Sequence, residues 1–117
     1  MHFAISATWG PTDPTRAALP FIFAASALQA GDTVTLMLFH DAVHMATTGT
    51  AEKLVPFGPP PRFEEVVAHA GAEVIVCKPC MVVRQLPEDK LDNRLALAGM
   101  NEFYAAAARE DARVVCF

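Results

Sequence analysis

Short apolar runs with the character of β-strands alternate along the chain with longer segments that have the features of helices. The apolar runs cover residues 2–8, 33–39, 73–76 and 113–117. The helical segments cover residues 14–30, 63–70, 78–85 and 101–109. Alternation of strands with helices predicts a parallel sheet with helices on both faces. We therefore expect one α/β domain over residues 1–117.

Residues typical of helix ends support the longest of these helices. Asp13 and Pro14 are expected to begin it, because aspartate caps free backbone N–H groups and proline suits the first helical position. The segment is apolar on nearly every side, which predicts that it is covered on more than one face. We expect a kink at Pro20 and an end at Gly31.

The connecting segments have less regular patterns. Residues 43–45 are expected to form a very short strand, and the proline-rich residues 55–61 a loop that crosses the end of the sheet. Asn101 is expected to cap the last helix, which is followed by the final strand.

Composition adds an expectation about assembly and partners. The chain is 53% hydrophobic and only 19% charged, more apolar than a typical domain of its size, so we expect a homo-oligomer. The formal net charge is −4 and no run of Lys or Arg is present. Nucleic acid is therefore an unsuitable partner, because its phosphates require a basic stripe.

The number of cysteines and the length of the apolar stretches indicate in which compartment the protein is found. Three cysteines are too few for a disulfide scaffold, and the chain does not open on a signal-peptide pattern. The longest uncharged stretch, Ala17 to Gly31, contains a proline and is shorter than the ~20 residues that a membrane span needs. We expect a cytoplasmic protein with reduced thiols and without a membrane span.

Three strand ends carry polar or reactive side chains. They are Thr8–Trp9, His40–Asp41 and Cys77. The carboxyl ends of parallel strands lie along one edge of a sheet, and ligands bind there. The topology can therefore bring these residues together, with His40 as a candidate base or hydrogen-bond donor and Trp9 either over a pocket or in a core or interface.

The stretch "EVIVCKPC", residues 73–80, holds the most reactive groups. Cys77 is placed where a strand passes into a helix, near a helix dipole and unpaired N–H groups, and we expect these to lower its pKa. Lys78 and Arg84 add positive charge nearby. Cys80 falls in the first turn of the same helix. The pattern predicts a functional thiol pair rather than two structural cysteines.

Three chemistries use this cysteine spacing. A reactive thiol that carries a transferred group is favoured. A thiol–disulfide couple is second, because the motif occurs late in the chain and no Trp precedes it. A metal clip that joins Cys77 and Cys80 to His40 and His44 is third, so we expect no metal and no cofactor. A non-enzymatic, oligomeric small-ligand-binding protein remains a further alternative.

The remaining candidate groups have simpler interpretations. Cys116 is expected to be a packed core thiol in the last strand, since free cysteines are among the most buried residues. His2 and His69 are expected at the surface.

Several segments resemble the DsrE/DsrF-like proteins nearly end to end. They are "GPTDPTRAALPF", "ALQAGD", "VTLMLFHDAVHMA", the cysteine and basic residue Cys77 and Arg84, and "ALAGMNEFYAAAAREDARVVCF". The motifs are loose, and this chain departs from many members in having Gln85 rather than glycine after Arg84.

The resemblance implies a three-layer α/β/α sandwich with a five-stranded, mainly parallel sheet, assembled as trimers or hexamers. It also implies a sulfur carrier related to sulfurtransferases, in which Cys77 accepts sulfane sulfur as a persulfide and relays it to a partner thiol. Expected partners are sulfur-donor and sulfur-acceptor proteins of rhodanese-like, TusA-like or DsrC-like type. Cys80 is expected to act as partner or resolving thiol, with Lys78, Arg84, His40, Asp41 and Trp9 in supporting positions.

Overall fold

The computed structural model describes residues 1–50 and 62–117. The described elements, in chain order, are β1 (His2–Ala7), α1 (Pro14–Gln29), β2 (Thr33–Leu38), the 3-10 helix η1 (His40–Ala46), α2 (Phe63–Ala68), β3 (Ala72–Cys77), α3 (Lys78–Val83), the 3-10 helix η3 (Glu88–Lys90), β4 (Ala96–Ala98), α4 (Met100–Ala107) and β5 (Ala112–Cys116). The proline-rich loop expected at residues 55–61 lies outside the described residues.

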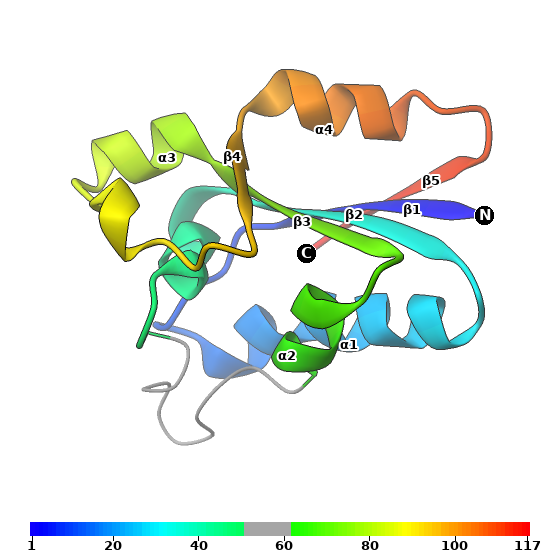
Figure 1. Cartoon of the computed structure of the whole chain (residues 1–117), viewed down its shortest axis with the longest axis horizontal. Coiled ribbons are helices and arrows are strands. Elements are labelled where there is room, and N and C mark those ends of the chain that lie inside the picture. The colour runs from blue at the N-terminus through cyan, green and yellow to red at the C-terminus, as the bar shows by residue number, and fades with distance from the viewer. Residues whose placement is uncertain (51–61) are drawn as a thin grey trace.

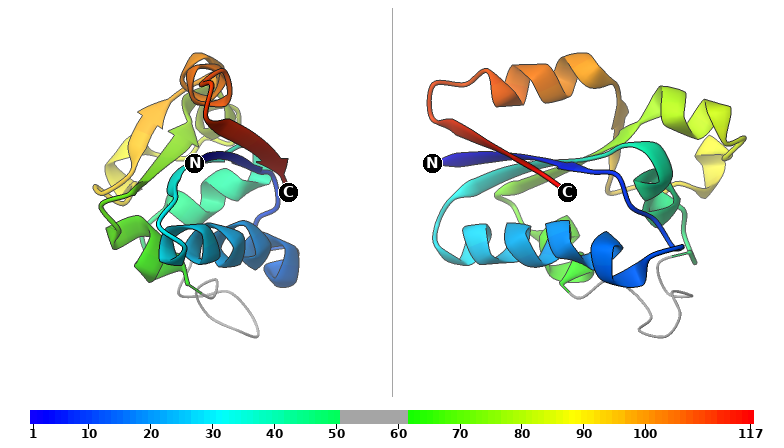
Figure 2. Two further views of the ribbon diagram at one scale, coloured as in Figure 1. Left: turned by 90° about the vertical axis from the view of Figure 1, so that its right-hand side faces the viewer. Right: turned by 180° about the vertical axis from the view of Figure 1, so that it is seen from behind.

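These elements form the expected three-layer α/β arrangement. The five described strands make one parallel sheet in the order β4-β3-β2-β1-β5. Helices α1 and α2 cover one face, and α3 and α4 lie on the other (Figures 1 and 2). Because all strands run the same way, their carboxyl ends meet at one edge of the sheet, which is where η1 and α3 begin.

The main core lies between the sheet and α1. Strand β2 is buried from Val34 to Leu38, as is usual for a central parallel strand covered on both faces. Helix α1 contributes Phe21, whose side chain is fully buried and whose ring centroid lies 5.0 Å from that of Phe63 in α2. The helix begins as predicted, because Asp13 Oδ1 accepts a hydrogen bond from the Arg16 N–H. Pro20 is also buried within it.

The opposite face is covered only in part. Helix α4 has no buried residue, and Tyr104 is 71% exposed. Strand β5 is an edge strand in which Val114 is half exposed. Cys116 is exposed too, so the prediction of a packed core thiol is wrong: β5 has a neighbouring strand on one side only, and none of its residues is buried.

Two local predictions are corrected by the structure, and one strand was missed. Residues 43–45 belong to η1 rather than to a strand, because Ala42, Val43, Met45 and Ala46 are buried at the spacing of a helical turn. Gly99, rather than Asn101, is the N-cap of α4, and its N–H is bound by Glu102. Strand β4 was not predicted, because three residues are too short to show alternation.

His2 is buried, which contradicts the surface position expected for it. Only 4% of the residue is exposed, and its two ring nitrogens lie 2.7 Å from Thr33 Oγ1 and 2.9 Å from Thr35 Oγ1. Burial, followed by the nearby positive charge of Arg109, lowers the pKa of the imidazole below its ordinary value of 6.5. His2 is therefore held as a neutral ring between β1 and β2. His69 is exposed, as predicted.

This histidine makes stability depend on pH. The unfolded chain binds a proton at His2 near pH 6.5 and the folded chain only at lower pH. The His2 contribution is therefore complete above pH 6.5 and is lost as the pH falls through the lower folded-state pKa. We expect the denaturant concentration at the unfolding midpoint to decrease when the pH is lowered from about 7.5 to about 5.5. The decrease should be smaller in His2→Gln. Equal slopes for the unsubstituted chain, His2→Gln and a His69→Gln control would contradict this role.

Candidate functional site

The junction between β3 and α3 carries both cysteines of the predicted pair. Cys77 ends β3 and is the N-cap of α3, and Pro79 occupies the first turn. The Cys77 sulfur accepts a hydrogen bond of 3.4 Å from the N–H of Cys80. Sulfur thus takes the place that an oxygen occupies in most N-caps, and this contact holds the two cysteines within one helical turn.

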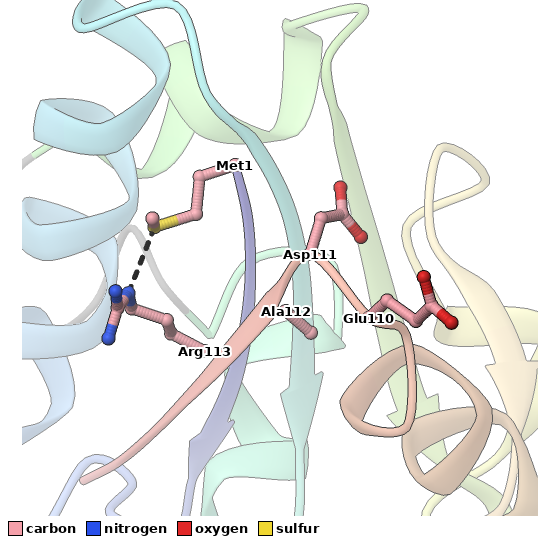
Figure 3. A pocket seen from close by; sticks show the side chains of 5 residues that line it. All are labelled: Met1, Glu110, Asp111, Ala112 and Arg113. Atoms are coloured by element: carbon pink, nitrogen blue, oxygen red, sulfur yellow. Dashed lines mark hydrogen bonds between the residues drawn. The ribbon is translucent and has the colours of Figure 1, made fainter.

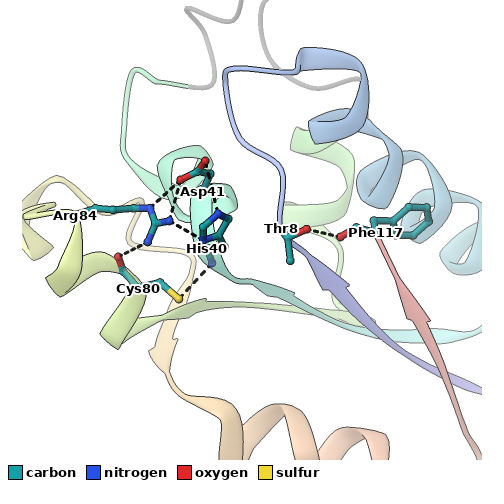
Figure 4. Close-up of polar contacts among 6 residues, drawn as sticks. All are labelled: Thr8, His40, Asp41, Cys80, Arg84 and Phe117. Carbon is teal, nitrogen blue, oxygen red and sulfur yellow. Dashed lines mark hydrogen bonds and ion pairs between the residues drawn. The ribbon is translucent and has the colours of Figure 1, made fainter.

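Cys80 is the more accessible of the two thiols. It is partly exposed, whereas Cys77 is only 6% exposed and belongs to the apolar core. The Cys80 sulfur accepts a hydrogen bond of 3.2 Å from the backbone N–H of His40 (Figure 4). His40 has φ = 53°, a left-handed conformation that few non-glycine residues adopt. The first residue of η1 thus directs a backbone donor at the sulfur, where it stabilises negative charge.

Arg84 joins α3 to η1 around Cys80. Its Nε lies 3.0 Å from Asp41 Oδ1, its Nη2 lies 2.8 Å from His40 Nδ1, and its Nη1 lies 3.2 Å from the Cys80 carbonyl oxygen (Figure 4). Because a guanidinium only donates, His40 Nδ1 is the acceptor, and a neutral ring then carries its proton on Nε2. The hydrogen bond from Arg84 lowers the pKa of Asp41. Arg84 therefore helps to fix the position of His40, whose backbone N–H donates to the Cys80 sulfur.

The expectation of a lowered pKa at Cys77 is wrong. Burial, followed by the hydrogen bond with the Cys80 side chain, raises the pKa of the Cys77 thiol. The N–H of Cys80 and the charge of Arg84 act in the opposite direction, but they are the smaller influences. Its surroundings therefore favour the neutral thiol form of Cys77.

The other predicted site residues are only partly gathered here. Cys77, Cys80, His40, Asp41 and Arg84 are linked by the contacts described above. The Lys78 ammonium lies 3.7 Å from Glu88, and the Trp9 ring is covered by the guanidinium of Arg16 at 4.4 Å. Neither contact is with a cysteine. Within residues 1–50 and 62–117, no group of three or more His, Cys, Asp or Glu side chains is arranged to hold a metal ion.

Sequence analysis missed the role of Gly10. A Cβ atom at this position would lie 2.2 Å from the backbone oxygen of Asp41, so only glycine allows the segment after β1 to pack against η1. The stretch Trp9-Gly10-Pro11 indicates a turn, but no local pattern shows which distant residue the turn will contact.

A hollow at the opposite edge of the sheet has no comparable chemistry. It has a volume of about 460 Å³ and is lined by Met1, Glu110, Asp111, Ala112 and Arg113 (Figure 3). Arg113 Nε lies 3.2 Å from Met1 Sδ, and the Asp111 carboxylate pairs with Arg109. None of these five side chains is a thiol or hydroxyl nucleophile, so the carboxyl edge of the sheet is the better candidate site.

Fold and site together define a small parallel α/β protein with a thiol pair at the carboxyl edge of its sheet. The chain belongs to the DsrE/DsrF-like family, whose model matches residues 1–117. An uncharacterized protein of Methanocaldococcus jannaschii is 32% identical over 120 residues, which cover the whole of both chains. The family indicates a role related to sulfur relay.

A solved structure agrees with this fold. The crystal structure of the ychN protein from E. coli superposes with a TM-score of 0.80 at 19% sequence identity, over 99% of this chain and 97% of that one. None of the helices in the described part of the chain has the length and apolar character required to cross a membrane.

Proposed function

We propose that this protein is a sulfur carrier that binds sulfane sulfur as a persulfide on Cys77 and relays it to a partner protein thiol. The observation that carries the proposal is the thiol pair at the β3–α3 junction, where both sulfurs accept backbone N–H hydrogen bonds. Family membership supports the same chemistry, because it links the chain to sulfur relay. The free state of all three cysteines suits a reducing compartment, for which we propose the cytoplasm.

Loading is a nucleophilic displacement at sulfur. A thiolate of the pair attacks the sulfane sulfur of a donor persulfide, a new S–S bond forms, and the donor leaves as a thiolate. Delivery is a second displacement of the same kind. A thiolate of the acceptor protein attacks the outer sulfur, and the carrier cysteine leaves as a thiolate. The N–H groups of His40 and Cys80 stabilise the negative sulfur in both steps, and Arg84 holds His40 in place.

Self-association is part of this proposal. Five large apolar side chains stay exposed on the α3, α4 and β5 side of the sheet, namely Val82, Val83, Met100, Tyr104 and Val114. Apolar side chains gathered on one side of a fold favour burial against another protein surface. We propose that a further copy of the chain covers this side, in a trimer or hexamer. Native mass spectrometry measures the subunit count, and a monomer at micromolar concentration would contradict the idea.

Intact mass spectrometry tests the carrier function. All variants should also contain Cys116→Ser, because that exposed thiol outside the site would take up sulfur by itself. After treatment of reduced protein with inorganic polysulfide, we expect the mass of added sulfur on the chain with both site cysteines. We expect none on Cys77→Ser/Cys80→Ser, since no nucleophile then remains at the site. Equal loading of the two proteins would rule the proposal out.

A thiol–disulfide switch is the second candidate. It is favoured by the hydrogen bond between Cys80 N–H and the Cys77 sulfur, which keeps the two cysteines one helical turn apart. In the same experiment the switch would lose two hydrogens without gaining sulfur. A reduction potential within the cellular range would then strengthen it.

A further inference from the structure

The two cysteine thiols differ in solvent access and in hydrogen bonding, and these differences indicate which of them takes up sulfur first. We infer that sulfane sulfur is first accepted by Cys80 and then passes to Cys77, which stores it. This inference rests on the proposed function. It adds the roles of the two cysteines, which the sequence leaves open.

Access favours Cys80 as the first acceptor. A protein donor must bring its sulfane sulfur into line with the attacking thiolate, which requires an open path to the sulfur. The Cys80 thiol is partly exposed at the start of α3, whereas 94% of Cys77 is covered by the core that also buries Met81. A donor meets Cys80 first unless the helix moves.

Electrostatics favours the same order. The N–H of His40 points at the Cys80 sulfur over 3.2 Å, and η1 holds that N–H in a left-handed conformation supported by Arg84. Cys77 has the opposite character, because burial raises the pKa of its thiol. Burial therefore disfavours an attacking thiolate at Cys77, whereas the His40 N–H is in place to stabilise negative sulfur at Cys80.

The capping geometry then allows transfer between the two sulfurs. Cys77 is the N-cap and Cys80 the third residue of α3, and the N-cap sulfur accepts the N–H of the third residue. This contact brings the Cys77 thiol to the same turn as the sulfur on Cys80.

The transfer balances without an outside reagent. Cys80 thiolate takes the outer sulfur of the donor persulfide, and the donor leaves as a thiolate. The Cys77 sulfur then attacks the outer sulfur of the Cys80 persulfide, the Cys80 S–S bond breaks, and the proton of Cys77 passes to the Cys80 sulfur. One persulfide and one thiol are present before and after this second step, so there is no net oxidation. Stored at Cys77, the sulfur is shielded from water and from small thiols.

Single variants in the Cys116→Ser background test the order of the steps. We expect Cys77→Ser still to take up sulfur from inorganic polysulfide, but to hold it only at the partly exposed Cys80. Cys80→Ser should load at least about tenfold more slowly than the background protein, since its remaining thiol is buried and mostly protonated. After loading, cyanide should remove sulfur from the background protein about tenfold more slowly than from Cys77→Ser, because only the former stores it at the buried position.

A measurement on the unsubstituted chain covers the case in which a variant folds poorly. Limiting iodoacetamide followed by peptide mass analysis should modify Cys80 before Cys77. Loading of Cys80→Ser at the background rate, or first modification at Cys77, would overturn the order. An internal disulfide with released sulfide would overturn storage at Cys77. Failure of every protein, including the background, to take up sulfur would instead remove the proposed function itself.

Discussion

Phe21→Ala is expected to lower the free energy of unfolding by about 3–5 kcal/mol, the usual cost of truncating a buried aromatic side chain to alanine. Phe21 is fully buried in the middle of α1 and contacts the ring of Phe63 in α2. Its removal leaves a cavity between the two helices and the sheet, which the rigid strands cannot close. Domains of this size have total stabilities of only about 5–15 kcal/mol, so a large part would be lost.

Chemical denaturation monitored by circular dichroism measures this loss, and Trp9, the one tryptophan of the chain, gives a fluorescence signal for comparison. Ile22→Ala is the matched control, because Ile22 is the next residue of the same helix and is 39% exposed. We expect the control to lose less than half as much stability. Similar losses for Phe21→Ala and Ile22→Ala would show that the packing of α1 is not centred on Phe21.

The fold was predictable because its signals are local. Asp13-Pro14 and Gly31 define the ends of α1 through backbone chemistry that involves only neighbouring residues. The β3–α3 junction at Cys77 was predictable in the same way, since an apolar run stops where a proline-containing helical turn begins. Alternation of these elements then leaves a parallel sheet as the simplest arrangement.

The burial and protonation of these residues were not predictable, because both depend on which distant segments cover them. Cys77 lies at a helix N-terminus but is also buried in the core. The cost of burying a charge there exceeds the favourable effects of the Cys80 N–H and of Arg84. His2 is buried for a similar reason, since its pairing with β2 places it between two threonine hydroxyls. Cys116 stays exposed because β5 is an edge strand.

From the sequence, His40 and Asp41 could be placed only at the same edge of the sheet as the cysteines. Their contacts with Arg84 and Cys80 could not be predicted. Their contacts depend on the backbone of η1, which begins with the left-handed residue His40 and turns the chain back toward α3. Nothing in the pattern of residues 40–46 specifies that turn. The structure shows instead that it is supported by the segment after β1, through the close approach of Gly10 to Asp41.

Gly10→Ala should therefore disturb the site from outside it. The added Cβ would lie 2.2 Å from the Asp41 backbone oxygen and 2.9 Å from its carbonyl carbon, distances at which either segment must shift. Because these are backbone atoms, a side-chain rotation cannot relieve the clash. We expect a loss of about 1–3 kcal/mol in the free energy of unfolding, comparable to overpacking in a core. A shift of η1 would also move the His40 N–H away from the Cys80 sulfur.

Loss of the His40 N–H as a donor should slow sulfur loading at Cys80 by about tenfold. This is roughly the effect on a rate expected from the loss of one charge-assisted hydrogen bond. Gly99→Ala is the matched control, because a Cβ there would meet only Glu102 Oε2 at 3.9 Å. Denaturation midpoints and polysulfide loading rates should be measured for both variants in the Cys116→Ser background. If Gly10→Ala matched the control in both measurements, η1 would hold its position without support from the segment after β1. If it lost stability but loaded sulfur at the normal rate, the N–H of His40 would have no part in sulfur uptake.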